Sequence, residues 1–312
     1  MNNLSEFQVA LLKVFKQFAK YCEENDLTYY AAYGTLLGAV RHKGFIPWDD
    51  DIDVYMKRED YDKMIANRGF LEGTPYRITY ILDGKSPYPF AKFYTTEGTI
   101  WEYKHFPFII GPWIDIFPVD EGDINDENAN KTYNSLHYLM WKYRKAIADV
   151  KWSDIWKDFI RFNGYNGPMN LVKKVYYRPF KKKYLREIAA CIDDIRKIRS
   201  DVLRVYASNS GKMAFSKELF DSTLSVPFED TQIMIPIGYD KVLTRWFGNY
   251  MQLPPIERRV SNHNCFYINL NENVPKEDIL KQMAGKLNEK AQPLSMKLLI
   301  NEIRHRNKGW HQ

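Results

Sequence analysis

The sequence contains few cysteines and no long apolar segment. Its three cysteines, Cys22, Cys191 and Cys265, lie far apart and form no Cys-x-x-Cys pair, so neither a disulfide framework nor a zinc site is indicated. No apolar run is long enough to span a bilayer, and the N-terminus lacks the charged start, apolar stretch and cleavage site of a signal peptide. We therefore expect a cytoplasmic protein, either soluble or peripheral at the inner face of the membrane.

Two common nucleotide-binding motifs are also missing. There is no Gly-x-Gly-x-x-Gly, and Gly211-Lys212 is followed by Met213 instead of the Ser or Thr of a P-loop. The net charge of +6 is mild for 312 residues and says little about partners until the charges are located. Aromatic residues, in contrast, are abundant: 22 Tyr, 18 Phe and 8 Trp indicate stacking or interfacial surfaces as well as core.

The acidic segment at residues 48–55 (WDDDIDVY) is the most informative stretch. Asp51 and Asp53 alternate with Ile52 and Val54, so on a strand both carboxylates would leave one face while the apolar side chains enter a core. Neighbouring carboxylates repel, and burying them uncompensated is costly, so the pattern favours a divalent cation between them. An isolated Asp-x-Asp is also typical of a solvated acidic turn. The choice between a metal site and a turn therefore depends on the neighbouring motifs.

Two further features coincide with this pair of acids. Gly34-Thr35 stands at a predicted strand-to-helix turn, where backbone N–H groups and a hydroxyl can meet a phosphate. Asp115 is a lone acid between two isoleucines on a predicted buried strand, where it could complete a metal site or accept the proton of an attacking hydroxyl. Together these features predict phosphoryl transfer on a nucleotidyltransferase fold.

Three other classes of protein share part of this pattern. An EF-hand loop beginning at Asp49 fails, because Val54 stands where the loop needs glycine and Asp60 replaces its last glutamate. A metal-dependent glycosyltransferase that uses a nucleotide-sugar also has an Asp-x-Asp, but it does not account for Gly34-Thr35 or Asp115. A non-catalytic scaffold that binds nucleotide or membrane is the third alternative.

The fold class we predict is α+β: a nucleotidyltransferase-like mixed β-sheet with flanking helices and a mostly helical C-terminal part. The first helix covers about twenty residues, and Asn3 and Glu6 have the spacing of a capping box. Residues 76–103 are expected to form a β-meander. We divide the chain into a catalytic core (1–125), a helical, basic and aromatic lobe (126–210) and a C-terminal part packing on the core (211–312).

Within the lobe, residues 152–186 interleave aromatic with basic side chains. Seven lysines and arginines and no acid lie between residues 173 and 186. A solvated helical face is one interpretation. The other is a peripheral contact with anionic lipid headgroups, to which each basic residue adds roughly 1 kcal/mol. No nucleic-acid motif accompanies the charge, so we expect no nucleic-acid partner.

Three blocks of the sequence resemble the LicD family, which includes bacterial phosphocholine transferases and is related to fukutin-type phospho-alcohol transferases. The first block joins YGTLLG at residues 33–38 to RHKGFIPWDDDID at residues 41–53. The second is WIDIFP at residues 113–118, and the third includes IPIGYD at 235–240, FGNYM at 247–251 and LPP at 253–255.

The resemblance implies a transferase for substituted phosphate groups. It would move phosphocholine, or a related phospho-alcohol, from CDP-choline or another CDP-alcohol to a hydroxyl of a glycan or lipid-linked glycan. This acceptor would be a cell-surface polysaccharide precursor of the teichoic acid, lipopolysaccharide or capsule type, and CMP would leave. On this interpretation Asp51 and Asp53 hold Mg²⁺, with Mn²⁺ as an alternative, on the pyrophosphate, and Asp115 is the third ligand or the general base.

The same resemblance suggests the substrate contacts. Gly34 and Thr35 would cradle phosphate, Arg41 and His42 would neutralise its charge, and Lys92 would be a second phosphate contact if its strand faces the site. A choline ammonium would favour an aromatic cage, worth roughly 0.5–2 kcal/mol per contact. The candidates for this cage are Tyr33, Trp48 and Trp113.

Overall fold

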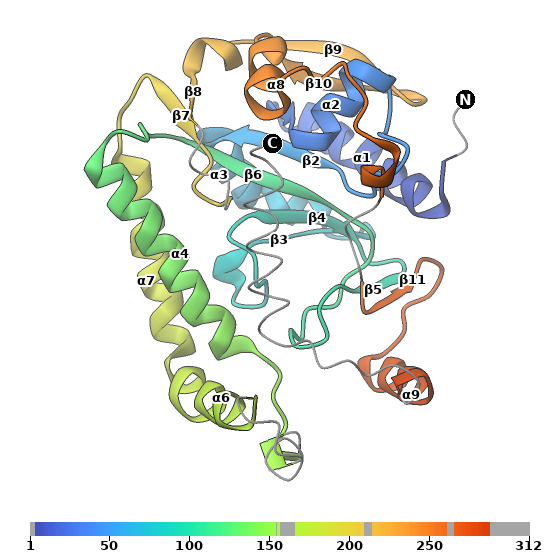
Figure 1. Cartoon of the computed structure of the whole chain (residues 1–312), viewed down its shortest axis with the longest axis vertical. Coiled ribbons are helices and arrows are strands. Elements are labelled where there is room, and N and C mark those ends of the chain that lie inside the picture. The colour runs from blue at the N-terminus through green and yellow to red at the C-terminus, as the bar shows by residue number, and fades with distance from the viewer. Residues whose placement is uncertain (1–3, 154, 157–165, 209–213, 261–264, 288–312) are drawn as a thin grey trace.

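The structure is a computed structural model that describes residues 4–153, 155–156, 166–208, 214–260 and 265–287. Helices surround a mixed β-sheet (Figure 1), which confirms the predicted α+β class. The helices are α1 (Glu6–Glu24), α2 (Tyr33–His42), α3 (Arg58–Ala66), α4 (Glu127–Ile147), α6 (Asn166–Val172), α7 (Lys181–Lys197), α8 (Tyr239–Phe247) and α9 (Lys276–Leu287). No helix in these ranges is both long and apolar enough to cross a membrane.

Within the described ranges, the central sheet has seven strands. Its main path is β1-β2-β6-β4-β3, and β7 and β8 extend it from the far end of β6. Strands β2 and β6 are parallel, and the other pairs are antiparallel. The strands of the sheet are β1 (Tyr30–Ala31), β2 (Asp53–Lys57), β3 (Tyr76–Thr79), β4 (Ala91–Thr95), β6 (Trp113–Glu121), β7 (Val202–Arg204) and β8 (Ala214–Ser216).

The remaining strands form two small ribbons. Strands β9 (Thr223–Phe228) and β10 (Thr231–Pro236) make a hairpin, and β5 (Thr99–Trp101) pairs with β11 (Tyr267–Asn269). The predicted meander is therefore correct for β3 and β4, which pair, but wrong for β5, whose partner comes from the C-terminal part. Strand β7 lies within the predicted 126–210 lobe yet joins the core sheet, and the proposed domain boundaries remain predictions.

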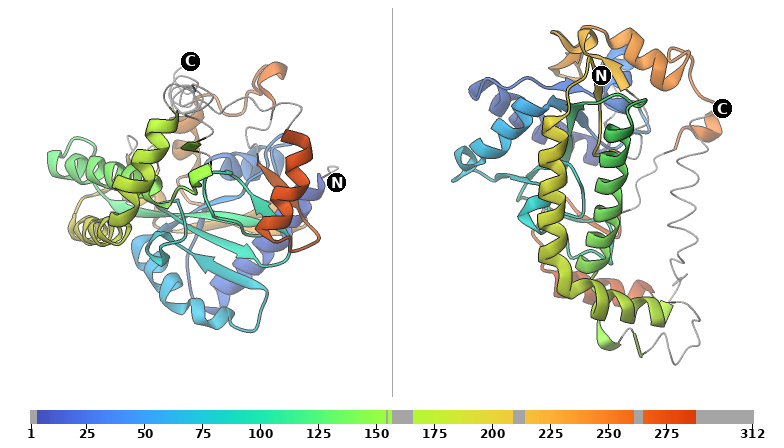
Figure 2. Two further views of the ribbon diagram at one scale, coloured as in Figure 1. Left: turned by 90° about the horizontal axis from the view of Figure 1, so that it is seen from below. Right: turned by 90° about the vertical axis from the view of Figure 1, so that its left-hand side faces the viewer.

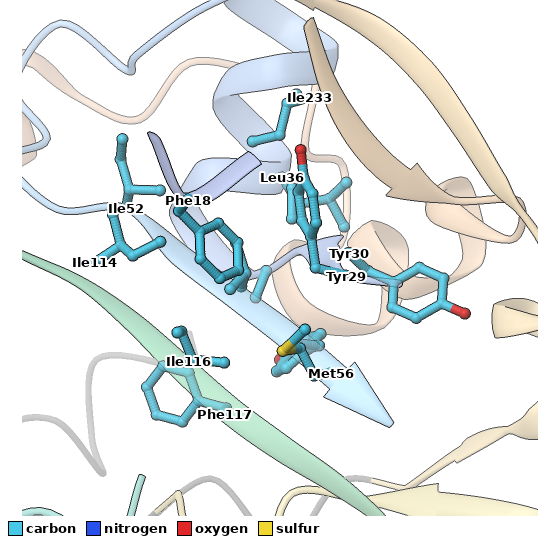
Figure 3. Close-up of a cluster of buried hydrophobic side chains, with 14 of the residues drawn as sticks. Phe18, Tyr29, Tyr30, Leu36, Ile52, Met56, Ile114, Ile116, Phe117 and Ile233 are labelled. Atoms are coloured by element: carbon cyan, nitrogen blue, oxygen red, sulfur yellow. The ribbon is translucent and has the colours of Figure 1, made fainter. Parts of the chain in front are cut away.

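The two faces of the sheet differ in chemistry because side chains alternate along each strand. Val54 and Ile116 are register partners on β2 and β6 and are fully buried. Phe18 of α1 lies among the buried apolar side chains of the core (Figure 3). Its ring is 5.6 Å from that of Phe93, which lies on the same face of the sheet. Helices α1 and α3 thus cover this apolar face, and the side chains of opposite parity, including Asp53 and Asp115, lie on the other face.

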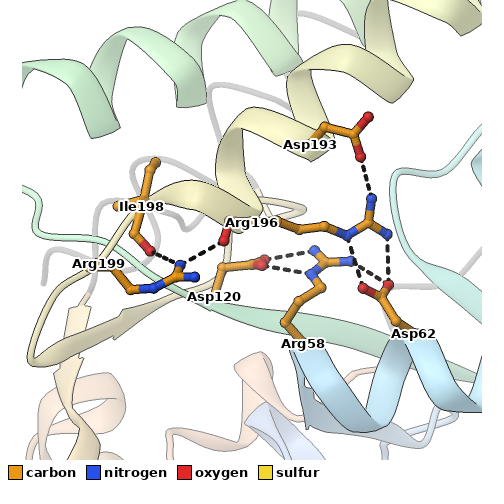
Figure 4. Close-up of polar contacts among 7 residues, drawn as sticks. All are labelled: Arg58, Asp62, Asp120, Asp193, Arg196, Ile198 and Arg199. Carbon is orange, nitrogen blue, oxygen red and sulfur yellow. Dashed lines mark hydrogen bonds and ion pairs between the residues drawn. The ribbon is translucent and has the colours of Figure 1, made fainter.

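Helices α4 and α7 run side by side away from the sheet, and α6 lies at their far end (Figures 1 and 2). We call α4, α6, the π-helix η3 (Lys173–Tyr177), the 3-10 helix η4 (Arg178–Phe180) and α7 the helical arm. A network of ion pairs joins the C-terminal end of α7, which we call the base of the arm, to the core (Figure 4). Arg58 donates to both oxygens of Asp120 at 2.6 and 2.8 Å, and Arg196 of α7 donates twice to Asp62 at 2.9 Å.

A histidine in the arm makes stability depend on pH. One ring nitrogen of His137 lies 3.1 Å from the Tyr206 carbonyl oxygen, and burial lowers the His137 pKa to about 4. The unfolded chain binds this proton near pH 6.5, so folding becomes less favourable as pH falls from about 6.5 towards 4. Between pH 7 and pH 5 this histidine should remove about 2 kcal/mol of unfolding free energy.

The variant His137→Gln, which keeps a donor for the Tyr206 carbonyl, should lose that share of the pH dependence. Urea unfolding of both proteins at pH 7 and pH 5 measures it. An equal fall in stability for wild type and variant would contradict the assignment.

Candidate active site

Three polar side chains, which we call the acid row, lie across adjacent strands on the face of the sheet opposite to α1 and α3. Asp53 of β2 is in register with Asp115 of β6, which is in register with Lys92 of β4. The Lys92 ammonium donates to Asp115 Oδ1 at 2.6 Å. The two strands predicted to carry acids are therefore neighbours, and their acids lie side by side.

Lys92 is almost completely buried, with 2% of its side chain exposed. Its Nζ lies 4.2 Å from the ring centroid of Trp113, 4.4 Å from that of Tyr88 and 5.4 Å from that of Phe90. The three rings and Asp115 compensate the buried ammonium, since an unpaired buried charge would be costly. Lys92 faces the predicted site, and the ring of Trp113, a candidate for the choline cage, already contacts a cation.

The carboxylates of the row are unusually basic. The pKa of Asp53 lies well above its usual range. Burial is the largest cause, and the negative charges of Asp51, Asp115 and Asp49 raise the pKa further. Burial raises the pKa of Asp115 to about 6, although Lys92 acts in the opposite direction. Lys92 therefore compensates only part of the negative charge gathered here.

This donor set fits a divalent cation. Among the described residues no three side chains of His, Cys, Asp or Glu are already placed to hold one ion together. Asp51 and Asp53 are hard oxygen donors, and a cation between them would offset the charge that raises the pKa of Asp53. Asp115 is held by Lys92, which favours a role in proton transfer over one as a third ligand.

Helix α2 approaches the acidic segment through its first turn. Thr35 is buried, and its hydroxyl accepts the backbone N–H of Asp53 at 2.9 Å, so it positions the strand that carries the acid. A Cβ added to Gly34 would lie 2.4 Å from Asp49 Oδ2, so glycine is what allows this carboxylate to approach the helix. The predicted phosphate cradle is thus adjacent to the acids, at the positive end of a helix.

Tyr33 begins α2 with a positive φ of 44°, which is uncommon for a residue other than glycine. Its ring centroid lies 5.1 Å from that of Tyr55, 5.4 Å from that of Phe117 and 5.0 Å from that of Trp246. Tyr55 and Phe117 share the strand face of Asp53 and Asp115. Tyr33 therefore belongs to an aromatic cluster beside the acid row.

A second cationic group lies at the end of α2. Arg41 donates to the Tyr250 carbonyl at 2.7 Å and, through Nε, to His42 Nε2 at 3.0 Å. Burial, and then the Arg41 charge, lower the His42 pKa, which agrees with a neutral ring acting as acceptor. Trp48 packs edge-on against His42 at 6.4 Å, and the guanidinium of Arg259 lies 5.6 Å from the Trp48 ring. These predicted residues are thus brought together, with Arg41 holding the 250–252 segment.

Sequence reasoning missed four residues of this region. Gln8 is buried and donates to the Asp49 carbonyl at 2.8 Å, which anchors the acidic segment on α1. Tyr88 and Phe90 line the Lys92 environment, and Arg259 joins the cations near Trp48. Only Arg259 carried a signal, because it follows the Leu-Pro-Pro block. The others act through contacts between distant segments.

A mixed sheet with acids side by side on parallel strands, next to the first turn of a helix, is the arrangement of a nucleotidyltransferase. The model of the LicD/FKTN/FKRP nucleotidyltransferase domain matches residues 26–186, and the chain belongs to the LicD family.

Individual proteins also match the chain. The chain is 29% identical over 265 residues to the lipopolysaccharide cholinephosphotransferase LicD of Haemophilus influenzae, covering 83% of this chain and 96% of that protein. It is also 42% identical over 72 residues to an uncharacterized protein of Rickettsia prowazekii, covering 23% of this chain and 27% of that protein.

Proposed function

We propose that the protein transfers phosphocholine, or a related phospho-alcohol, from a CDP-alcohol to a hydroxyl of a cell-surface glycan precursor. The observation that carries the proposal is the row of Asp53, Asp115 and Lys92 within a LicD-family domain. The name of the Haemophilus relative, which matches over nearly its whole length, supports choline as the alcohol and lipopolysaccharide as the acceptor type. Precursors of teichoic acid or capsule are the alternative acceptor types.

In the proposed reaction the acceptor hydroxyl attacks the phosphorus that carries the choline. The bond from this phosphorus to the oxygen it shares with CMP breaks, and CMP leaves with the bonding electrons. Asp115 accepts the hydroxyl proton, because its pKa of about 6 leaves it mostly ionised at neutral pH yet basic enough to bind a proton. Lys92 fixes the orientation of this carboxylate through Oδ1.

Asp51 and Asp53 would hold Mg²⁺, which supplies charge stabilisation on the phosphates when bound. The first turn of α2, with Gly34 and Thr35, offers backbone N–H groups next to the same acids. Arg41 and Arg259 place further positive charge near Trp48. The pKa of Arg41 is lowered mainly by burial and also by the nearby charge of Arg259. Such a pair of like charges would be stabilised by a phosphate between them.

The test is CMP release from a panel of CDP-alcohols (choline, ethanolamine, glycerol and ribitol) with Mg²⁺, Mn²⁺ or EDTA. Water can replace the missing acceptor and give slow hydrolysis. We expect release from one CDP-alcohol, at least tenfold above the rest, that EDTA abolishes. Release unaffected by EDTA would contradict the metal role, and release of UDP or GDP from a nucleotide-sugar instead would favour glycosyl transfer.

A further inference from the structure

The helical arm carries a continuous chain of aromatic rings at the end remote from its base. Tyr138 and Trp141 of α4 stack at 6.1 Å, and Trp141 meets Tyr177 of η3 at 5.8 Å. Tyr176 then contacts Tyr177 at 5.1 Å and Phe180 at 6.3 Å. Two segments more than thirty residues apart in the sequence thus build one surface.

Most of these rings are open to solvent. The exposed fractions are 56% for Tyr138, 48% for Trp141, 61% for Tyr176 and 44% for Phe180. Such a contiguous group of large exposed apolar side chains on a folded protein indicates a contact surface. None of these side chains takes part in the acid row or its surroundings.

Lysines accompany the rings. The ammonium groups of Lys142 and Lys145 lie 4.2 and 4.3 Å from the centroids of Tyr138 and Trp141, and Lys183 lies 6.0 Å from that of Phe180. We call these eight residues the arm patch: Tyr138, Trp141, Lys142, Lys145, Tyr176, Tyr177, Phe180 and Lys183. Neighbouring cations extend it, since residues 173–186 contain seven basic residues and no acid. One carboxylate borders the patch, that of Glu187, which lies 3.8 Å from Lys183 Nζ.

The composition of the arm patch discriminates between partners. Lysine is depleted at protein–protein interfaces, whereas exposed tyrosine and tryptophan beside lysine are typical of membrane surfaces. There the rings enter the headgroup region and the ammonium groups meet anionic lipids.

We propose that the arm patch docks the protein on the surface of an anionic phospholipid bilayer. The inference stands on the arm alone and would hold for any reaction at the acid row. For an acceptor held in a membrane, however, docking would place enzyme and acceptor at the same surface.

The helical arm also contacts a loop next to the acid row, in addition to the sheet. Arg144 of α4 donates to the Pro87 carbonyl at 2.8 Å, next to Tyr88 of the Lys92 environment. Two residues after the end of α4, the Asp149 N–H donates to the His105 carbonyl at 2.8 Å. A docked arm would therefore hold the loops around the site in a fixed orientation to the bilayer.

Vesicle sedimentation of the full chain tests the proposal, with phosphatidylcholine vesicles alone or mixed with phosphatidylglycerol. We expect binding only to the mixed vesicles, weakening as salt is raised. The triple variant Lys142→Gln/Lys145→Gln/Lys183→Gln should bind about 100-fold more weakly, since each lysine near the surface contributes roughly fivefold. The variant Trp141→Ala/Tyr176→Ala/Phe180→Ala should bind at least about tenfold more weakly.

The matched control is Lys13→Gln/Lys16→Gln/Lys20→Gln, which removes the same charge from α1 and should bind as wild type does. Thermal unfolding of each variant verifies that it is folded. Equal binding to neutral and mixed vesicles, or equal losses in patch and control variants, would overturn the proposal. Binding to heparin but not to mixed vesicles would also overturn it and would assign the patch to a soluble polyanion.

Discussion

Asp53→Asn should reduce metal-dependent CMP release by about 10³-fold while leaving the protein at least as stable as the wild type. The two effects have one cause. The pKa of Asp53 is raised well above its usual range by burial and by Asp51, Asp115 and Asp49, so its ionised form costs folding free energy at neutral pH. An amide of the same shape removes that cost but also removes a metal-binding oxygen.

The measurement pairs CMP release with urea unfolding in EDTA for wild type, Asp53→Asn and the control Asp26→Asn. Asp26 is fully exposed and has a positive φ that asparagine tolerates. The control should match the wild type in both assays. If the Asp53→Asn variant released CMP at the wild-type rate, the acid row would have no part in the mechanism. A marked loss of stability in this variant would show that the carboxylate is structural.

Lys92→Met should be the most destabilising single change at the site. It leaves Asp115 buried without its partner, and breaking a buried ion pair in this way costs about 3–5 kcal/mol. Removal of Lys92 also removes the influence that lowers the Asp115 pKa, which therefore rises further. A raised folded-state pKa costs stability that grows as pH rises from the unfolded-state pKa towards the folded-state pKa, so the stability deficit should be larger at pH 8 than at pH 5.5.

The double variant Lys92→Met/Asp115→Asn separates stability from catalysis. Because no ionised carboxylate is left unpaired, the double variant should recover most of the stability lost by Lys92→Met at pH 8. It should remain inactive, since asparagine cannot accept the hydroxyl proton. Urea unfolding at both pH values and CMP release measure these outcomes. A Lys92→Met protein as stable as the wild type at pH 8 would contradict the ion-pair assignment.

The strands that carry the acids could be predicted because alternation is a local signal. Ile52 and Val54 mark one face around Asp53, and Ile114 and Ile116 do the same around Asp115. Their register is not local: nothing in either segment specifies that residue 53 lies beside residue 115. The same holds for β5, whose pairing with β11 joins segments more than 160 residues apart.

Local signals were ambiguous where two residues fit one rule. The predicted capping pair of Asn3 and Glu6 was wrong, because Ser5 caps α1 and exchanges two hydrogen bonds with Gln8. Both pairs have the same spacing, and the choice was decided by packing, since the Gln8 side chain also reaches the Asp49 carbonyl. Asn3 itself lies outside the described residues.

The roles of Thr35 and Lys92 depend on long-range contacts in the same way. A threonine after a glycine turn suggests phosphate binding, but its hydroxyl also accepts the Asp53 N–H. A lysine between aromatic residues on a strand suggests a phosphate contact, and its partner in the structure is Asp115. Residue types could be read from the sequence, whereas the partner of each depended on the assembled sheet.

The most direct test of the account is a competition followed by ³¹P NMR. The protein is given CDP-choline and a nucleotide-sugar together, with Mg²⁺ and a glycan acceptor, and the released nucleotide is identified. We expect CMP to appear together with a new phosphodiester on the glycan, while the nucleotide-sugar remains intact. Release of UDP or GDP with CDP-choline unconsumed would contradict phospho-alcohol transfer at the row of Asp53 and Asp115.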